Sequence, residues 1–569
     1  MLAFAQANFV PLLFAGLVGF LLLGFPVAFS LAATGLFFGF IGMEMGLFPP
    51  ELFQALPLRV IGIMQNETLL AIPFFTLMGI TLERSRMAEE LLETVAQVFG
   101  PIRGGLAVAV ILVGALLAAT TGVVAAAVMS MGLISLPVML RYGYNPAIAA
   151  GTITASGTLA QALPPSLVLI VLADQLGRSV GDMYQGALYP GMMLIGLYLA
   201  FIMLIALVRP RWVPALPAEA RIFRESDGAS GHRSLGALAV LTGAVGMVCY
   251  HHYDSLIDTL LDRRAPAPAD ERLIVAVAAA AFLALVLAWV NRRLQLGLLS
   301  RLTEQVTFVL IPPLILIFLV LGTIFLGVAT PTEGGAMGAM GALAMAALRG
   351  RLSRQVLGEA MENTTRLSIF VLFILIGSTV FSFTFNAADG AVWVEHLFAQ
   401  LPGGQLGFLL FVNALVFTLG MFIDFFEIAF IVVPMLAPVA DKMGIDLIWL
   451  GILLAMNMQT SFLTPPFGFA LFYLRNVAPT EAYTDTATGK RIPGITTAQI
   501  YRGAISFIVI QLLMVGVLLF NPEIVSSHLA HTEKLDAATV EQLLDLQNEP
   551  ESPPDGDNGL DSLGIEEEW

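Results

Sequence analysis

Two stretches of this 569-residue chain share one pattern: ITASGTLAQALPPSLVLIVLADQ at residues 153–175 and LAMNMQTSFLTPPFGFALFYLRN at residues 454–476. Each carries a proline pair inside an otherwise apolar run, and the two pairs, Pro164-Pro165 and Pro465-Pro466, lie 301 residues apart. Upstream residues keep this offset without a gap: Pro137 with Pro438, and Gly143 with Gly444. The chain therefore contains two halves of similar layout.

Each proline pair is expected to interrupt a membrane-spanning helix. Proline removes a backbone donor and clashes with the carbonyl four residues back, so two in succession should unwind the helix locally. An unpaired carbonyl in lipid costs several kcal/mol, and such a break survives only where protein, water or an ion satisfies it. A structural kink is the simpler reading of one proline. The recurrence of the pair in both halves favours an ion site.

The composition indicates a polytopic, all-α membrane protein. Hydrophobic residues make up 57% of the chain, charged residues only 12%, and the mean hydropathy is +0.85. Most of the uncharged runs reach the roughly 20 residues that a spanning helix needs; they cover residues 1–43, 104–140, 142–173, 183–208, 234–253, 273–291, 305–332, 367–388, 447–474 and 503–522. No basic region precedes the first run, so it does not read as a removable signal peptide.

Charge and cysteine content exclude several function classes. The net charge of −15 is concentrated after residue 522, where 13 acidic residues and one lysine leave the rest of the chain near −3. No basic patch indicates nucleic-acid binding. The single cysteine, Cys249, forms no internal disulfide, and the sequence has no zinc-type Cys/His spacing.

The distribution of basic residues predicts the orientation. When full crossings are alternated along the chain, one side collects 20 of the 27 Lys and Arg residues, and this side is assigned to the cytoplasm. Both termini then lie on the periplasmic side. Seven crossings separate the two repeated regions, an odd number, which predicts inverted repeats; they are 147–174, 183–208, 234–253, 273–291, 305–328, 333–348 and 367–388.

Residues 104–140 and 405–440 are predicted to form re-entrant helical hairpins. Each run is 36–37 residues long, with a small or polar centre: AATTGVV in the first and TLGMFIDFFE in the second. Two full crossings would need about 40 residues plus a turn, so two half-membrane helices fit better.

The predicted organisation has four parts. A first transmembrane repeat covers 1–210, with hairpin 104–140 and broken helix 147–174. A central insertion with scaffold helices covers 211–300. A second repeat covers 301–522, with hairpin 405–440 and broken helix 447–474. An acidic tail at 523–569 is expected to hold a short amphipathic helix, EKLDAATVEQLLDL, and a disordered end.

At this point the residues resemble a known family, the large permease subunit (DctM-like) of TRAP transporters. The resemblance covers about residues 1–210 and 300–522. It is carried by TTGVVAAAV followed by SLPVMLRYGYNPAIAAGTITASGTLAQALPPS, and by GVATPTEGGAMGA, LGMFIDFFEIAFIVVPMLAPVADKMGID and TPPFGFALFYLR. The segment MNMQTSFLTPPFGFALFYLR is similar to the subgroup linked to mannitol, chloroaromatic acids and 2-oxo or hydroxy acids.

The resemblance implies a sodium-coupled symporter in the bacterial inner membrane. A periplasmic solute-binding protein delivers a small organic-acid substrate, and a small TRAP membrane subunit, expected as a separate chain, pairs with the large one. Movement is of the elevator type, and no cofactor beyond the coupling ion Na⁺ is implied.

The family's sodium ligands carry over to two sets of positions. The first set is Thr121, Ala160, Leu163 and Pro165; the second is Thr418, Gly420, Ser461 and Thr464. Ala160 and Ser461 stand where the family usually has glycine. Backbone carbonyls supply much of such a site.

Polar side chains around the two breaks are candidates for substrate binding: Thr120, Ser156, Thr158, Gln161, Asp424, Asn457, Gln459 and Thr460. Asp424 and Glu427 lie in an apolar hairpin, where a charged group is energetically costly and indicates a function. The alternative is that both lie at the aqueous hairpin tip and have no role in binding. The other residues are also read as interhelical hydrogen-bonding groups. Few basic residues are available to bind a carboxylate, so helix N-termini are expected to contribute.

Two further polar features have simpler interpretations. Thr332 and Glu333 are expected to cap a helix that opens after Pro331-Thr332. His251, His252 and Asp254 are expected in an exposed extracellular loop, not at a metal site.

Three alternatives remain open at this stage. A stand-alone ion-coupled carboxylate carrier or antiporter shares hairpins and inverted repeats. A membrane enzyme would need a catalytic constellation, and the sequence has no GxSxG, HExxH or metal cluster. A structural subunit would have no use for two broken helices. The sequence thus favours a transporter and not an enzyme.

Overall fold

The computed structural model describes residues 4, 6, 8–223, 231–261, 269–485 and 488–527. These residues belong to one compact unit, Met1–Ser527. The amphipathic helix and disordered end expected in the acidic tail lie outside the described residues.

The first half of the described chain is entirely helical, as the long apolar runs predict. Its elements are α2 (Phe9–Leu22), α3 (Val27–Glu44), η1 (Pro50–Ala55), α4 (Leu56–Met64), η2 (Glu67–Leu70), α5 (Ala71–Arg84), α6 (Met87–Phe99), α7 (Gly105–Thr121), α8 (Val124–Arg141), α9 (Pro146–Thr158), η3 (Leu159–Gln161), α10 (Leu167–Gln175) and α11 (Val180–Val208).

The rest of the chain adds the central helices and the second half. Its elements are η4 (Ala218–Ala220), α12 (His232–Leu261), α13 (Ala269–Leu294), α14 (Arg301–Phe325), α15 (Pro331–Leu348), α16 (Arg354–Ala387), α17 (Gly390–Ala399), α18 (Gly404–Leu419), α19 (Phe425–Glu427), the π-helical η5 (Ile428–Val432), α20 (Val433–Lys442), α21 (Leu447–Ser461), α22 (Phe469–Val477), the two-residue strands β1 (Tyr483–Thr484) and β2 (Arg491–Ile492), α23 (Thr497–Phe520) and α24 (Glu523–Ser526).

Among the described residues, eight helices are long and apolar enough to cross a membrane. The number of candidate spans rises to ten if each of two bent helix pairs counts as one span. These pairs are Pro50–Met64 with Glu67–Arg84, bent by 43°, and Gly390–Ala399 with Gly404–Leu419, bent by 114°. Apolar side chains such as Leu348, Leu22 and Leu207 stay exposed on this bundle, as expected of a protein whose outer surface faces lipid.

The order of elements repeats at the offset seen in the sequence. α8 and the segment α19–η5–α20 begin and end 301 residues apart, as do the first residues of α9 and α21. The caps correspond as well, because Asn145 Oδ1 and Asp446 Oδ1 each accept two first-turn N–H groups. The hairpin tips differ: Gly122 and Gly420 are only 298 residues apart, so the second tip holds three extra residues.

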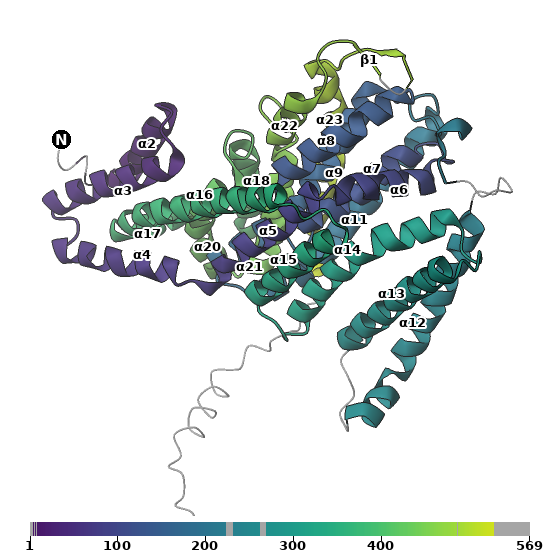
Figure 1. Cartoon of the computed structure of the whole chain (residues 1–569). Coiled ribbons are helices and arrows are strands. Elements are labelled where there is room, and N and C mark those ends of the chain that lie inside the picture. Colours follow the sequence, from purple (N-terminus) through teal and green to yellow (C-terminus); the bar gives the residue numbers. More distant parts are fainter. Residues whose placement is uncertain are drawn as a thin grey trace, which may run out of the picture. The chain divides into compact units, whose positions relative to one another are not determined.

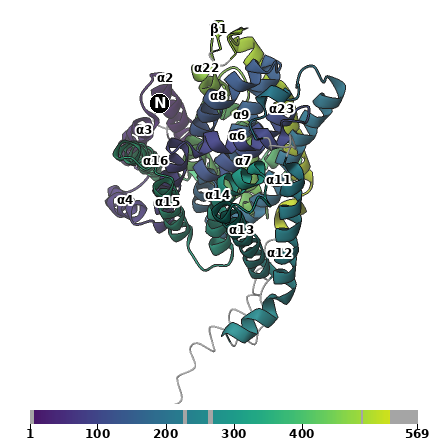
Figure 2. The same ribbon diagram turned by 45° about the vertical axis from the view of Figure 1, so that its right-hand side comes forward.

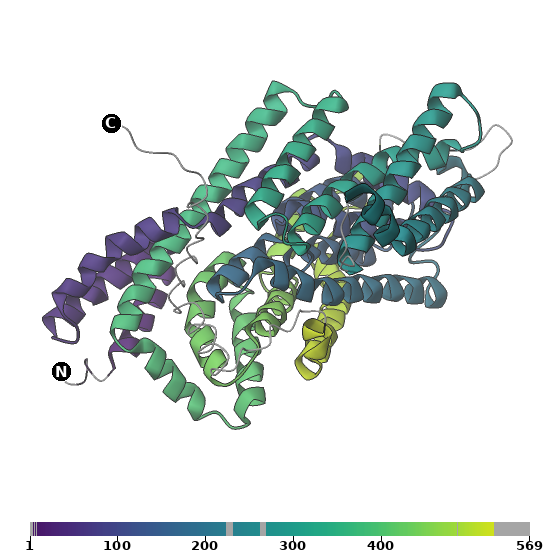
Figure 3. The same cartoon turned by 90° about the horizontal axis from the view of Figure 1, so that it is seen from below.

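Contacts between distant segments build the bundle. α3 runs beside α16, as Figures 1 and 3 show, and α5 packs on α15. α7, α8 and α9 pack on one another (Figure 2), while α12 pairs with α13 (Figure 1) and both contact α14. α23 crosses α9 where Gly503 faces Gly151. A Cβ on Gly503 would stand 1.9 Å from the carbonyl oxygen of Ala147, so two backbones touch here.

A proline pair does not interrupt every helix of this protein. Pro312 and Pro313 lie inside the continuous helix α14, contrary to the general expectation that two prolines in succession unwind a helix. Pro312 cannot donate to the carbonyl of Phe308, four residues back. Nη2 of Arg349 donates to that oxygen at 2.6 Å instead. A side chain that directly follows α15 therefore satisfies this carbonyl, and the helix continues.

A small β-hairpin fastens the loop between α22 and α23 to the end of α8. Tyr483 pairs with Ile492 and Thr484 with Arg491 in antiparallel register. Arg141 donates from Nη2 to Asp485 Oδ1 at 2.7 Å, and the Thr488 backbone N–H donates to Oδ2 at 2.9 Å. Hydrogen bonds from Thr488 and Arg141 hold the pKa of Asp485 below its ordinary value. The charged carboxylate therefore ties this loop to the first hairpin.

Two local expectations were wrong. The N-cap of α15 is Thr330, not Thr332: Thr330 and Glu333 form a capping box, and Pro331 takes the first helical position, where a missing N–H is tolerated. The Thr332 hydroxyl instead donates to Glu67 O at 2.6 Å. His251, His252 and Asp254 lie inside helix α12 and not in a loop. Asp254 pairs with Arg272 of α13 at 2.8 Å, and no metal-binding group of three His, Cys, Asp or Glu side chains occurs among the described residues.

Candidate functional site

The first interrupted helix leaves buried carbonyl groups without partners. α9 ends at Thr158, one 3-10 turn follows, and α10 begins at Leu167. The carbonyl oxygens of Ala160, Leu163 and Pro165 accept no hydrogen bond from the described residues. All three residues are buried. Because a buried carbonyl without a partner is unfavourable, these oxygens need water or a cation.

The tip of the hairpin α7–α8 lies against this break. Gly122 ends α7 with φ of +60°. A Cβ at Gly122 would lie 2.9 Å from Leu167 Cγ and 3.2 Å from the Leu167 backbone nitrogen. Only glycine supplies both the left-handed turn and this approach. The structure therefore brings the tip residues Thr120 and Thr121 beside the start of α10.

Thr120 and Thr121 are both buried, and each hydroxyl donates to Leu117 O at 2.9 Å. A hydroxyl that donates its hydrogen keeps lone pairs that can accept or coordinate. On the outer side of the tip, a Cβ at Gly79 of α5 would stand 2.4 Å from Thr121 Cα. α5 thus packs directly on the residue that the resemblance assigns to sodium.

The second half repeats this arrangement with differences. Gly420, at the tip after α18, faces Ser461 at the end of α21, so closely that a Cβ on Gly420 would stand 2.1 Å from Ser461 Oγ. Thr464 is half-buried, and its hydroxyl donates to Thr460 O at 2.9 Å. The side chain of Thr418 is exposed and donates to Ala414 O at 2.8 Å. The structure therefore brings Gly420 and Ser461 together, whereas the Thr418 side chain is occupied on its own helix.

Two carbonyls at the second break converge on one glycine. Gly468 has φ of +46°, and a Cβ there would meet Thr464 O at 2.9 Å and Phe462 O at 3.1 Å. Ala470 N–H donates to Phe462 O, while Thr464 O accepts no hydrogen bond from the described residues. The second break is more open than the first, because Pro466 and Phe467 are exposed.

A buried hydrogen-bond cluster joins the two interrupted helices. Thr158 and Gln459 stand at equivalent positions of the halves, 301 residues apart. Gln511 of α23 donates from Nε2 to the Tyr198 hydroxyl at 2.6 Å and approaches Thr158 Oγ1 at 3.5 Å. Gln459 Nε2 reaches the same Tyr198 hydroxyl at 3.5 Å. Tyr198 and Gln511 were not predicted. Their signal in the sequence is a polar side chain within an otherwise apolar span.

We expect Tyr198→Phe to lower the free energy of unfolding by about 1–2 kcal/mol, because Gln511 and Gln459 would keep buried amide groups without this partner. Gln511→Leu should cost a similar amount, and the double variant should lose less than the sum of the two. Thermal unfolding of the purified chain in detergent checks this. Strictly additive losses would show that the two side chains act independently.

The remaining candidate side chains have different surroundings. Ser156 donates to Ile153 O at 3.0 Å and faces Gly114 of α7. Asn457 donates to Asn413 O of α18 at 2.6 Å, and Thr460 donates to Met456 O at 2.9 Å. Gln161 is fully buried, and neither its Oε1 nor its Nε2 has a partner among the described residues. Both polar atoms of Gln161 are therefore free to bind a ligand, and Oε1 of Gln459 is a second buried atom without a partner among the described residues.

Asp424 and Glu427 form a capping box at the start of α19. Asp424 Oδ1 accepts from Phe425 N–H at 2.7 Å, and Glu427 Oε2 accepts from Asp424 N–H at 3.2 Å. This geometry satisfies the donors at the helix start. It gives both carboxylates a structural role at the second hairpin tip, and a role of Asp424 in substrate binding stays a prediction.

The two halves meet around these breaks. α21 contacts both η3 and α10, and α10 also contacts α19 and η5 of the second hairpin. A multi-helix bundle of apolar spans with two interrupted helices, each met by a hairpin tip, defines a multi-pass membrane protein with a polar centre.

The comparisons with known proteins identify the family. The family model described as "Tripartite ATP-independent periplasmic transporter, DctM component" matches residues 14–524. The chain belongs to this family, and it is a multi-pass inner-membrane transporter component, not an enzyme.

Individual relatives are distant but cover most of the chain. The C4-dicarboxylate TRAP transporter large permease protein DctM of Pseudomonas aeruginosa is 26% identical over 479 residues, which is 84% of this chain and 90% of that protein. The sialic acid TRAP transporter large permease protein SiaM of Vibrio cholerae is 24% identical over 473 residues, or 83% of this chain and 90% of that protein. The solved Alcanivorax borkumensis YdaH transporter is similar with a TM-score of 0.47 at 15% identity, covering 82% of this chain and 87% of that one.

Proposed function

We propose that the chain is the large membrane subunit of a sodium-coupled importer of small organic acids, including 2-oxo or hydroxy acids. A periplasmic solute-binding protein delivers the substrate, and a separate small membrane subunit completes the transporter. Both termini face the periplasm, the two halves are inverted, and the hairpins are re-entrant parts of an elevator-type moving unit. The tripartite family description and the relatives for C4-dicarboxylates and sialic acid support this proposal.

One observation carries the proposal. The buried carbonyls of Ala160, Leu163 and Pro165 accept no hydrogen bond from the described residues and lie beside the hairpin tip that bears the Thr121 hydroxyl. Hard cations such as sodium favour oxygen ligands. Carbonyl oxygens freed by an interrupted helix coordinate the coupling ion in several transporter folds. The second ion site is formed by Gly420, Ser461 and Thr464, with Thr418 nearby in sequence.

The substrate is expected between the hairpin tips and the breaks. The N-terminus of α8 follows Val123, which provides no side-chain cap, so its first N–H groups meet no capping side chain and can bind a carboxylate. The proposed polar contacts to the substrate are Thr120, Gln161 and Asn457, together with Ser156, Thr158, Gln459 and Thr460. Helix N-termini provide the positive potential that few basic side chains supply here.

Uptake by proteoliposomes tests the function. The vesicles would hold this chain and its small partner, with labelled 2-oxo and hydroxy acids offered with and without the binding protein and an inward sodium gradient. We expect uptake to need both. Uptake that is equally fast without the binding protein would contradict the proposal and favour a stand-alone carrier.

Thr121→Val tests the first ion site. Valine keeps the shape but removes the hydroxyl oxygen, so we expect the sodium concentration for half-maximal uptake to rise by about tenfold, one lost ligand interaction of about 1.4 kcal/mol. Thr242→Val is the matched control, because its hydroxyl also donates at 2.9 Å to the carbonyl four residues back, Leu238 O, on α12. An equal response of both variants to sodium would argue against a ligand role for Thr121.

A further inference from the structure

A cavity lined by arginines lies where α6, α13, α14 and α15 meet. It has a volume of about 460 Å³. Its charged lining residues are Arg292, Arg349, Arg351 and Glu90, three cations and one anion, and Gln305 adds a neutral polar side chain. The cavity is distinct from the interrupted helices, and none of the transport steps proposed above uses it.

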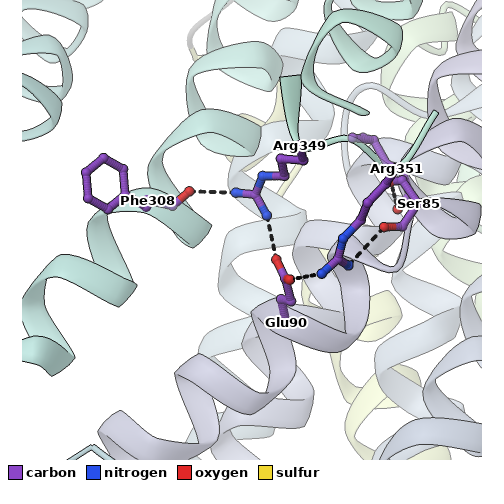
Figure 4. Close-up of polar contacts among 6 residues, drawn as sticks. Ser85, Glu90, Phe308, Arg349 and Arg351 are labelled. Carbon is purple, nitrogen blue, oxygen red and sulfur yellow. Dashed lines mark hydrogen bonds and ion pairs between the residues drawn. The ribbon is translucent and has the colours of Figure 1, made fainter. Parts of the chain in front are cut away.

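Glu90 fixes two of the arginines in place, as Figure 4 shows. Arg349 Nη1 bonds Glu90 Oε2 at 2.6 Å, and Arg351 Nη2 pairs with Glu90 Oε1. Arg349 also donates to Phe308 O, and Arg351 Nη1 donates to Ser85 O at 3.1 Å. One carboxylate thus neutralises one of two fixed guanidinium groups, which leaves a net positive charge at this site.

Arg292 adds a third cation, which none of the described acidic groups neutralises. Its guanidinium lies 5.5 Å from the centre of the Phe308 ring. Among the described residues, no carboxylate forms an ion pair with Arg292 within 4.0 Å. The side chain is exposed at the end of α13. It is therefore available to an external anion.

The other wall of the cavity is apolar. Val309, Pro312, Met345 and Leu348 line it, and Leu348 is 88% exposed. These residues belong to α14 and α15. Arg292 lies in the last turn of α13, and Arg349 and Arg351 follow the end of α15. A ligand that fits both walls is an amphiphile with an anionic head. A free metabolite would leave the apolar wall in contact with water.

We propose that this cavity binds the phosphodiester head group of an anionic glycerophospholipid. Basic pockets between helix ends on the cytoplasmic side of a membrane suit such head groups. The arginines here lie on the arginine-rich side of the chain, which basic-residue counting assigns to the cytoplasm. Guanidinium groups match phosphate oxygens in geometry. A bound lipid would hold the α12–α13 pair against α6 and α15.

The test uses the purified full chain in mixed micelles. Thermal midpoint and lipid adducts in native mass spectra would be measured with phosphatidylglycerol, with phosphatidylcholine, and with inorganic phosphate or glycerol 3-phosphate alone. We expect phosphatidylglycerol to raise the midpoint and to give retained adducts, while the other three do neither. Equal effects of phosphatidylcholine, or an equal shift by the soluble phosphates, would overturn the lipid assignment.

Variants then locate the site. Arg292→Gln should bind about fivefold less phosphatidylglycerol, the fold-change that corresponds to about 1 kcal/mol for each basic residue near an anionic surface. Arg293→Gln is the matched control, because Arg293 is the exposed neighbour on α13 and does not line the cavity. Leu348→Glu, at an exposed position, should weaken binding by repulsion without disturbing packing. Identical lipid binding by Arg292→Gln and Arg293→Gln would refute the proposed site.

Discussion

Gly503→Ala is expected to destabilise the protein severely, whereas Gly516→Ala on the same helix should leave it intact. A methyl group at Gly503 would stand 1.9 Å from Ala147 O and 2.9 Å from Gly151 N, and both are backbone atoms that no side-chain rotation can move. At Gly516 the same methyl group meets nothing within 4 Å. α9 and α23 would have to separate, and such overpacking costs about 3 kcal/mol or more.

The same Gly→Ala substitution is therefore expected to change the stability of the fold very differently at two places on α23. Alanine at Gly516 should be neutral or stabilising by up to about 1 kcal/mol, because alanine is the better helix former. Expression level, monodispersity and thermal midpoint of both purified variants measure the difference. If Gly503→Ala unfolds at the wild-type temperature, the close crossing of α9 and α23 is not required.

The large-scale features of this fold follow from local sequence. Uncharged runs near 20 residues predicted the helices, and the repeated proline pairs indicated where α9–α10 and α21–α22 are interrupted. The family resemblance, confirmed by the match over residues 14–524, came from contiguous motifs. The runs, the proline pairs and the family motifs are all contiguous in the chain, so they can be recognised before any contact between distant residues is known.

Other features depend on contacts between distant residues, and these were missed or misplaced. Pro312-Pro313 has the same composition as the interrupting pairs, yet α14 continues, and Arg349, 41 residues away from Phe308, supplies one of the two donors that the prolines remove. The Tyr198–Gln511 hydrogen bond joins residues 313 positions apart. The N-cap of α15 was misassigned for a local reason: Pro331 at the first helical position indicates Thr330, and that signal was present in the sequence.

The glycines at the two hairpin tips, Gly122 and Gly420, differ in backbone conformation, and this decides which of them is the better position for a functional test. Gly122 is held in a left-handed conformation, so any substitution there would strain the backbone as well as meet Leu167. Gly420 has an ordinary helical φ of −65°. A methyl group at Gly420 meets Ser461 of the second break most closely and Val416 O only at 3.2 Å, so it is the sharper test of whether the tip must approach the break.

We expect Gly420→Ala to abolish most sodium-driven uptake while leaving the fold intact. The new Cβ would lie 2.1 Å from Ser461 Oγ and 2.9 Å from Ser461 Cβ, so rotating the hydroxyl alone cannot relieve the clash. The tip would shift by a fraction of an ångström or more from the break, and an error of about 1 Å in a positioned site can cost roughly a hundredfold in rate. Uptake should fall by at least about tenfold, with a thermal midpoint near that of the wild type.

The double variant Gly420→Ala with Ser461→Gly isolates the cause. Removing the Ser461 side chain takes away the two atoms closest to the new methyl group, leaves only Val416 O at 3.2 Å, and keeps the Ser461 carbonyl in the chain. We therefore expect the double variant to recover a large part of the uptake that Gly420→Ala loses, with Ser461→Gly alone measured as the reference. Recovery would establish that close approach of tip and break is what transport needs. A double variant as inactive as Gly420→Ala would instead show that glycine at 420 acts through its own backbone, and the steric account of the second tip would fail.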